Sequence, residues 1–381
     1  INDSCGRETG DNVLKEVATR LQKEVRESDL VTRYCSDNFV ILVELKSDKQ
    51  EVYCLINRLQ KAMEQPYLVD RDQSINCTCA IGVSFYPEAY DLDLLIKQAE
   101  HALYEAKHDP AHDVCFYTEQ MGNSFSRRNQ IATQLAEALK NGEFDVYFQP
   151  IYSISSQTFI AVEAFLRWRS CQSKEICPDE FIPIAENCSY IDELTMLVLK
   201  KTSQLILTLN SKGIALQSVK VNITLGQMNK KGFAEQFVSW LKTYDIQPST
   251  ICIELTENRI TSLSMESKIN IEQLRSHKVL VAIDNFGTGE TSLQQLINLP
   301  VDYINIDKCL ISKIASDKQH HTITNSIVDT AHNLGIKVVA GGIENKEIYE
   351  KSKQLNCDCL QGYYLSLPKD ICGLIASNIF H

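Results

Sequence analysis

Residues 281–293 read VAIDNFGTGETSL, an apolar run followed by a polar, glycine-containing segment. Its apolar start, which ends at Ile283, is long enough for a strand that is buried on both faces. A carboxylate, Asp284, and a carboxamide, Asn285, come next, and a glycine-containing turn then leads to a helical pattern near Thr291. Barrels built from alternating strands and helices place their functional side chains at the carboxyl ends of the strands. A simple cap between a strand and a loop would explain this stretch equally well if it stood alone.

Four other apolar strand patterns end in polar side chains in the same way. They are AVEAFLRW with Glu163 and Arg167, SVKVNITL with Asn222, TICIELTEN with Glu254 and Glu257, and VDYINID with Asn305 and Asp307. Helical patterns separate most of these strands, and KVVAGG and DCLQGYY supply the last strands. The alternation predicts an α/β barrel. Oxygen ligands from successive strand ends are what a hard divalent cation such as Mg²⁺ prefers.

The order and spacing of these motifs resemble the EAL family, whose members are phosphodiesterases that hydrolyse the bacterial second messenger cyclic di-GMP. The resemblance implies a (βα)8 barrel of the TIM type over residues 144–381, opened by the antiparallel strands FDVYFQPIYSI and QTFIAVEAFLRW. It also implies a set of metal ligands, which are Glu163, Asn222, Glu254 and Asp284, with Glu257 steadying a neighbouring loop. These four oxygen ligands leave room for one vestigial Mg²⁺, which ligand binding would not require.

Three positions depart from the family's catalytic pattern. Asn285 replaces the second Asp of DDFGTG, Asn305 replaces the Lys of IKID, and Gly341 replaces the first Glu of AEGVE. In the family these groups bind the second cation or position the attacking water. Hydrolysis by two metals needs both cations to stabilise the developing charge, and loss of one preorganised polar group costs roughly 10²–10³ in rate. We therefore expect hydrolysis to be negligible.

Ligand binding is a separate matter from hydrolysis. Arg167 is the expected phosphate contact, because a guanidinium offers a fixed fork of donors, and a salt bridge inside the barrel mouth is the alternative. The resemblance also assigns ligand contacts to Gln149, Glu163, Phe165, Leu166, Asn222, Asp284, Asn305, Glu344, Gln361, Gly362 and Tyr363. Family members with altered sites of this kind often hold the dinucleotide without cutting it.

The chain up to residue 120 carries a second α/β pattern. It predicts a helix from about Asn12 to Val25 and then two strands joined by the polar tip CSDN. This pattern resembles the GGDEF family, which has a nucleotidyl-cyclase-like fold and makes cyclic di-GMP from two GTP molecules. In its signature loop, Cys35 and Ser36 replace two glycines that let the backbone approach phosphate. Asn38 replaces a metal-binding Glu, so we do not expect synthesis of cyclic di-GMP.

Other positions of this domain bear on nucleotide binding. Asn2 and Asp11 match guanine contacts of the family. Arg26 and Asp29 match the RxxD pattern of an inhibitory product site, although an exposed arginine beside an aspartate is also a common solvated pair. In the family, a strand with a metal-binding Asp precedes the position of Ile1. We therefore expect that the chain is part of a longer protein, with any sensor or membrane anchor upstream.

Composition narrows the class of protein. With 381 residues, of which 44% are hydrophobic, the chain can form two domains. A helix predicted over residues 121–143 connects them, either passing motion or acting as a plain linker. The net charge of -11 argues against a nucleic-acid partner. No apolar run approaches the length of a membrane span, so membrane contact would need an upstream segment.

The cysteine content points to a reducing compartment. There are 14 cysteines and no CxxC pair. Most of them lie in apolar strand patterns, where a thiol acts as a small core residue. This usage predicts reduced thiols and a cytoplasmic location, either of the whole protein or of the cytoplasmic part of a membrane-anchored one.

Together these features predict a tandem GGDEF–EAL protein in which both domains are catalytically inactive. The barrel would bind cyclic di-GMP and relay that binding through rearrangement of the domains, of a homodimer or of a partner protein. A regulator that acts only through protein contacts and no longer binds nucleotide is one alternative. A weak cyclic di-GMP phosphodiesterase is the other.

Overall fold

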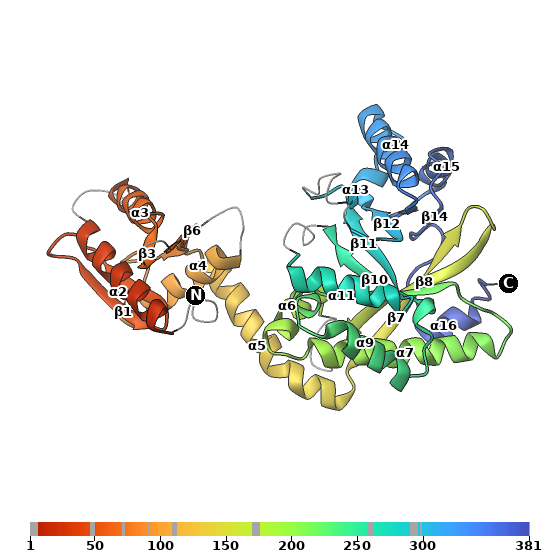
Figure 1. The fold of residues 1–381 in the computed structure, drawn as a ribbon, viewed down its shortest axis with the longest axis horizontal. Coiled ribbons are helices and arrows are strands. Elements are labelled where there is room, and N and C mark those ends of the chain that lie inside the picture. The colour runs from red at the N-terminus through yellow and green to blue at the C-terminus, as the bar shows by residue number, and fades with distance from the viewer. Residues whose placement is uncertain are drawn as a thin grey trace. The chain divides into compact units, whose positions relative to one another are not determined.

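A computed structural model describes the chain except for residues 1–6, 46–49, 71–72, 90, 109–112, 170–175, 258–262, 290–295, 298 and 381. Asn2 and the helical pattern predicted near Thr291 therefore lie outside the described residues. The chain divides into two compact units, Ile1–Asn129 and Gln130–His381 (Figure 1).

The first unit contains, within its described part, three helices and three two-stranded sheets. Its elements are α2 (Arg7–Glu24), β1 (Leu30–Cys35), β2 (Asn38–Leu42), α3 (Gln50–Met63), β3 (Tyr67–Asp70), β4 (Gln73–Ile75), β5 (Ile81–Val83), α4 (Leu92–His108) and β6 (Val114–Phe116). The predicted hairpin is present, since β1 pairs antiparallel with β2 and Leu30 lies opposite Leu42. Helix α2 begins earlier than predicted, because its polar first turn, with Glu8, shows no apolar periodicity.

Helix α5 (Glu119–Asn141) covers the segment where a connecting helix was predicted. Its buried residues Ile131, Leu135 and Ala138 lie at helical spacing and pack in a cluster with Trp168. Gly142 follows in the left-handed conformation, with a φ of 70°, which commonly ends a helix.

The second unit is a closed eight-stranded barrel, as predicted. Its strands are β7 (Phe144–Ser153), β8 (Thr158–Trp168), β9 (Ser218–Asn222), β10 (Ile251–Thr256), β11 (Leu280–Phe286), β12 (Tyr303–Ile306), β13 (Lys337–Ala340) and β14 (Cys359–Leu360). Around the barrel they follow the order β10-β11-β12-β13-β14-β7-β8-β9. Strand β7 runs antiparallel to both neighbours, β8 and β14, and every other neighbouring pair is parallel.

Helices follow most of the barrel strands and lie outside them (Figure 1). They are α6 (Pro178–Asn187), α7 (Ile191–Asn210), α8 (Leu225–Met228), α9 (Phe233–Thr243), α11 (Met265–Ser276), α13 (Lys308–Ile311), α14 (Lys318–Asn333), α15 (Lys346–Gln354) and α16 (Ile371–Ala376). Several begin at a side-chain cap, for example at Asp307, whose carboxylate accepts a hydrogen bond from the N–H of Cys309.

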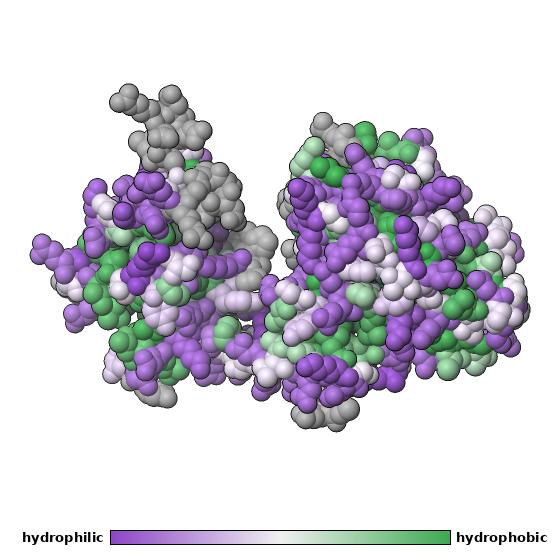
Figure 2. Space-filling view, turned by 60° about the horizontal axis from the view of Figure 1, so that its bottom comes forward, coloured by the Kyte–Doolittle hydropathy of each residue, from purple (hydrophilic) through white to green (hydrophobic). Residues whose placement is uncertain are grey.

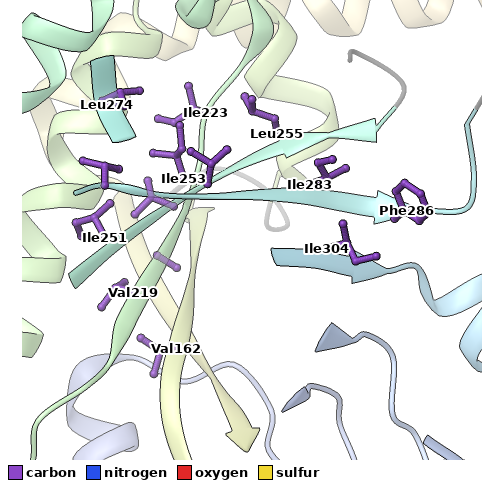
Figure 3. Close-up of a cluster of buried hydrophobic side chains, with 14 of the residues drawn as sticks. Val162, Val219, Ile223, Ile251, Ile253, Leu255, Leu274, Ile283, Phe286 and Ile304 are labelled. Carbon is purple, nitrogen blue, oxygen red and sulfur yellow. The ribbon is translucent and has the colours of Figure 1, made fainter. Parts of the chain in front are cut away.

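The main core of the second unit lies between the strands and this outer layer of helices. Val219, Ile253, Ile283 and Ile304 are fully buried there, and Leu274 of α11 packs against the same cluster (Figure 3). Because side chains alternate along a strand, the residues next to these apolar ones point into the barrel. That alternation carries the polar residues of the site to the interior.

The cysteine prediction was wrong for most positions. All twelve cysteines in the described part are free, but only Cys252, Cys357 and Cys359 are buried. Six are exposed, and Cys54, Cys372 and others of these lie on helices or their ends rather than in strands.

In the part of the chain that is described, no helix is long and apolar enough to cross a membrane. The face in Figure 2 is largely hydrophilic, with hydrophobic residues in small patches.

Candidate functional site

The site is built from polar side chains that neighbouring strands bring into register. Glu163 of β8 is paired with Gln149 of β7 on one side and with Lys220 of β9 on the other. Asn222 of β9 is likewise paired with Glu254 of β10. Side chains in register on neighbouring strands face the same side of the sheet, so these residues share the barrel interior.

One half of the site is a chain of amide contacts centred on Glu163. Gln361 donates from Nε2 to Glu163 Oε2 at 2.7 Å and to Gln149 Oε1 at 3.2 Å, and Gln149 donates in turn to the carbonyl oxygen of Ser366 at 3.0 Å. Asn222 donates from Nδ2 to Glu163 Oε1 at 3.3 Å. Burial, followed by the charges of the nearby carboxylates, raises the pKa of Glu163 well above its ordinary value. The amides therefore fix a carboxyl group that holds a proton easily.

The other half is centred on Glu254 and contains a residue that the sequence prediction missed. Lys220 donates from Nζ to Glu254 Oε1 at 2.9 Å and also contacts Asn305 Oδ1. Asn305 donates from Nδ2 to the same Glu254 oxygen and to Asp284 Oδ1, the latter at 3.0 Å. Lys220 is only 2% exposed. A charged residue between Val219 and Val221, inside an apolar strand pattern, was the sequence signal that could have identified it.

Electrostatics in this half follow from burial and pairing. Burial alone would lower the pKa of Lys220, but the charges of the surrounding acidic groups, Glu254 foremost, and the hydrogen bond to Glu254 together raise that pKa above its ordinary value. Lys220 is therefore a permanent cation. Burial, and then the charge of Glu254, raises the pKa of Asp284 from 3.8 to about 6, although the hydrogen bond from Asn305 opposes this.

These residues do not fit the pair of metal ions that the resemblance implies for catalysis. Asn285, Asn305 and Gly341 carry no charge to attract a second cation, and in the described residues no group of three or more His, Cys, Asp or Glu is arranged to hold a metal ion. The cation that contacts Glu254 is the ammonium of Lys220. Of the predicted metal ligands, Glu163, Asn222, Glu254 and Asp284 all lie in this network, joined by N–H donors.

The loop after β11 is held by Glu257, the residue predicted to steady it. Glu257 Oε2 accepts hydrogen bonds from the backbone N–H groups of Gly287 at 2.8 Å, Thr288 at 3.0 Å and Gly289 at 2.8 Å. Gly287 has a φ of 97°, and a Cβ there would come within 2.3 Å of a Leu310 methyl group, so glycine is required. Glu257 thus holds the backbone of residues 287–289 in place.

Asn285 begins this loop in an unusual backbone conformation. Its φ is 56°, in the left-handed region that asparagine and aspartate tolerate better than most residues. Two strands further round the barrel, Gly341 follows β13, where a Cβ would lie 3.0 Å from the carbonyl oxygen of Ile306. The backbone at position 285 thus suits an aspartate, whereas a side chain at position 341 would need a small shift of the β12 backbone.

The remaining predicted contacts lie at the barrel mouth. Arg167 is half-buried, donates to the carbonyl oxygen of Leu166 at 3.0 Å and has its guanidinium carbon 5.4 Å from the ring centre of Phe165. Tyr363 is 65% exposed, and Glu344 is also exposed. A Cβ on Gly362 would meet the Ile343 backbone at 2.2 Å, which gives this glycine a packing role whether or not it contacts ligand.

In the first unit, the altered signature loop is a tight turn. Ser36 has a φ of 46°, and its carbonyl oxygen accepts a hydrogen bond from Arg33 Nε at 2.8 Å. Cys35 is exposed, and Asn38 accepts a hydrogen bond from Lys107 at 3.2 Å. Lys107 therefore contacts the side chain that stands in place of the family's metal-binding Glu.

The predicted RxxD site is arranged locally. The guanidinium of Arg26 contacts the carboxylate of Glu51. Asp29 accepts a hydrogen bond at 2.9 Å from the backbone N–H of Arg26 rather than from its side chain. Arg26 and Asp29 thus form a turn, and the described contacts do not direct them at one common point. Asp11 is exposed on α2.

Comparison with known proteins identifies both units. The EAL domain model matches residues 132–368. The chain belongs to the EAL domain family. The model for the diguanylate cyclase, GGDEF domain matches residues 1–112, so the EAL barrel stands in tandem behind a GGDEF domain.

Relatives of this EAL protein have the same tandem. The bifunctional diguanylate cyclase/cyclic di-GMP phosphodiesterase MucR of Pseudomonas aeruginosa is 30% identical over 378 residues, which are 99% of this chain and 55% of MucR. The cyclic di-GMP phosphodiesterase NbdA of the same organism is 29% identical over 375 residues, 98% of this chain and 48% of NbdA. The chain spans about half the length of these relatives.

Solved EAL structures resemble the barrel. The cyclic di-GMP complex of the PaMucR phosphodiesterase has a TM-score of 0.61 and 30% sequence identity, and the match covers 64% of this chain and 99% of that one. The EAL enzyme Bd1971 with bound cAMP and cyclic di-GMP has a TM-score of 0.62 and 28% identity, over 68% of this chain and 71% of that one.

Proposed function

We propose that this protein is a cyclic di-GMP receptor whose EAL barrel binds the dinucleotide without hydrolysing it. The observation that carries the proposal is the contrast within one site. The Gln149–Gln361–Glu163 chain and Arg167 at the mouth keep the residue types expected for ligand contacts. The groups that the family uses for the second cation and the water are replaced by Asn285, Asn305 and Gly341.

The retained half supports binding because its side chains are already oriented. Gln149, Glu163 and Gln361 are each less than a tenth exposed and hydrogen-bonded to one another, so little conformational entropy is lost when a ligand arrives. Arg167 adds a charged donor at the mouth, where a phosphodiester would enter. The similarity to PaMucR, solved with cyclic di-GMP, supports the same ligand class for this barrel.

The altered half argues against hydrolysis. Without carboxylates at positions 285 and 341, a second divalent cation has no charged ligand there, and a two-metal mechanism cannot clamp both the attacking and the leaving oxygen. Effects within one catalytic cluster do not simply multiply. Even a single loss of roughly 10²–10³ in rate would leave turnover too slow for a useful phosphodiesterase.

The GGDEF domain would be a non-synthetic partner of the barrel in this scheme. Cys35 and Ser36 carry side chains where the family needs bare glycine backbone, and Asn38 already contacts Lys107. We propose that ligand binding in the barrel is relayed to this domain, to a second copy of the chain or to a partner protein, with α5 as the covalent route.

Incubation with labelled cyclic di-GMP and Mg²⁺ or Mn²⁺ tests this function. The protein-bound fraction is recovered by filtration, and its nucleotide is separated by chromatography. We expect intact cyclic di-GMP in the bound fraction after a long incubation. Linear dinucleotide would identify a weak phosphodiesterase. If no nucleotide is bound, the result would favour a regulator that acts only through protein contacts.

A further inference from the structure

Lys220 is the buried cation of the barrel. It lies on β9 in register with Glu163 of β8, and its ammonium reaches Glu254 Oε1 at 2.9 Å and the side-chain oxygen of Asn305. The side chains of Lys220 and Glu254 are 3% and 0% exposed, respectively. A buried ammonium is stable only when it is paired, and this one is paired with a carboxylate that the sequence assigns to metal binding.

The residue at position 305 shows that the positive charge of this site comes from β9, whereas the family motif supplies it from β12. Its position is that of the lysine in the family motif on β12, and here it carries a neutral amide. The amide oxygen of Asn305 contacts the ammonium of Lys220, and its Nδ2 donates to Glu254 and Asp284. The cation of this layer therefore comes from β9, and Asn305 connects it to both carboxylates.

The charge of the site also favours a fixed cation. The substitutions at Asn285 and Gly341 leave three acidic side chains in the network, which are Glu163, Glu254 and Asp284. Clustered carboxylates repel one another and would repel an anionic ligand at the mouth. An incoming divalent ion would have to lie beside the Lys220 ammonium at low dielectric or displace it from Glu254.

We propose that Lys220 takes the place of the divalent cation at this site, so that the charge of Glu254 is balanced by the protein itself. The consequence for ligand affinity, namely that cyclic di-GMP binds equally well without a divalent metal, rests on the proposed function. The occupation of the metal position by Lys220 does not rest on the proposed function, because it depends on Lys220 and Glu254 alone.

One oxygen of the cluster indicates what removal of Lys220 should do. Glu254 Oε2 is buried and has no hydrogen-bond partner among the described residues. With the ammonium gone, Glu254 would keep only the hydrogen bond from Asn305, and its unpartnered Oε2 would be open to a small cation without a positive charge beside it. A neutral residue at position 220 should therefore create a metal site that the parent lacks.

Mn²⁺ alone is the probe for this test. Binding to the full chain is followed by the loss of the free-ion signal in electron paramagnetic resonance and by the Mn²⁺-dependent rise in Tm. Lys220→Met is compared with the parent and with Lys337→Met, a control that removes an exposed lysine from another barrel strand, β13. We expect Lys220→Met to bind Mn²⁺ more tightly than the parent by about tenfold or more, because a nearby positive charge is gone. Lys337→Met should behave like the parent.

A second variant separates metal binding from a folding defect. Lys220→Met with Glu254→Gln removes both buried charges and should fold, yet should show none of the gained Mn²⁺ affinity. Folding of Lys220→Met only when Mn²⁺ is present would also support the proposal. Mn²⁺ binding to the parent as tight as to Lys220→Met would overturn it. If Lys220→Met does not fold under any condition, tight Mn²⁺ binding by the parent overturns the proposal and its absence supports it. Nucleotide is not needed for any of these outcomes, so failure of the proposed function is seen separately.

Discussion

The side chains of Lys220 and Asn305 are in hydrogen-bond contact inside the barrel, although β9 and β12 are not neighbouring strands. The contact places a positive charge from one strand against a neutral amide where the family has its own lysine. Glu254 accepts from both side chains. Lys220 thus brings to the site a cation that the resemblance to the EAL family did not predict, and this has consequences for the proposed repair of the site.

Repair of the catalytic site should require a change at Lys220. Asn285→Asp, Asn305→Lys and Gly341→Glu together restore the family's side chains; the left-handed backbone at position 285 suits an aspartate, and the new Cβ at position 341 would need a small shift of the Ile306 carbonyl oxygen. With Lys220 retained, however, two ammonium groups would meet beside Glu254. We expect the triple variant to hydrolyse cyclic di-GMP barely faster than the parent, and the same variant with Lys220→Ala to exceed the sum of its parts, because these groups act as a unit.

Conversion to the linear dinucleotide, measured by chromatography with Mn²⁺ present, checks this. Lys220→Ala alone is the control and should remain inactive. A triple variant that is as active with Lys220 as without it would show that the two ammonium groups do not conflict.

Arg167 should be a main anchor for cyclic di-GMP. Losing a charge-assisted hydrogen bond to phosphate costs about 1.5–3 kcal/mol, which is roughly a ten- to hundredfold loss in affinity. Arg167→Ala should show this loss in a calorimetric titration. Arg169→Ala is the matched control, since Arg169 is exposed beyond the end of the same strand and lies against the ring of Tyr147. Equal affinity of Arg167→Ala and the parent would place the phosphate elsewhere.

The stability of the barrel should depend on the ionisation of Asp284. Its pKa is raised from 3.8 to about 6, so between these values the folded state binds more protons than the unfolded state. The free energy of unfolding should therefore fall as the pH rises through this window. Asp284→Asn removes the titrating group, so its stability relative to the parent should increase from pH 4 to pH 7 by up to about 3 kcal/mol. Urea unfolding at several pH values measures this, and a difference that does not change with pH would contradict it.

The GGDEF domain should make no cyclic di-GMP from GTP and Mg²⁺. Side chains at Cys35 and Ser36 block the close approach of backbone to phosphate, and Asn38 supplies no charge for the metal. The variant with Cys35→Gly, Ser36→Gly and Asn38→Glu restores the residues of the family. Its new carboxylate would be contacted by Lys107, which competes with a metal ion for it. Dinucleotide formed by the parent would refute the prediction.

Much of this fold could be predicted because each barrel strand combines an apolar stretch with a polar end. The stretch before Asp284 is one example, and β11 lies where it was expected. Lys220 was not predicted, because a search for polar residues at strand ends does not include a charged residue inside an apolar strand. Its contact with Asn305, 85 residues along the chain, depends on the closure of the barrel and leaves no local pattern. The exposed cysteines were misjudged for a similar reason, since helix faces were not distinguished from strand faces.

The barrel should bind cyclic di-GMP without needing a metal and without cutting it. Calorimetric titration of the full chain with cyclic di-GMP, once in EDTA and once in Mg²⁺, tests it most directly. We predict the same micromolar affinity in both buffers and intact nucleotide in the cell afterwards. An affinity that appears only with Mg²⁺ would contradict binding without a metal, and no binding in either buffer would contradict the receptor function itself.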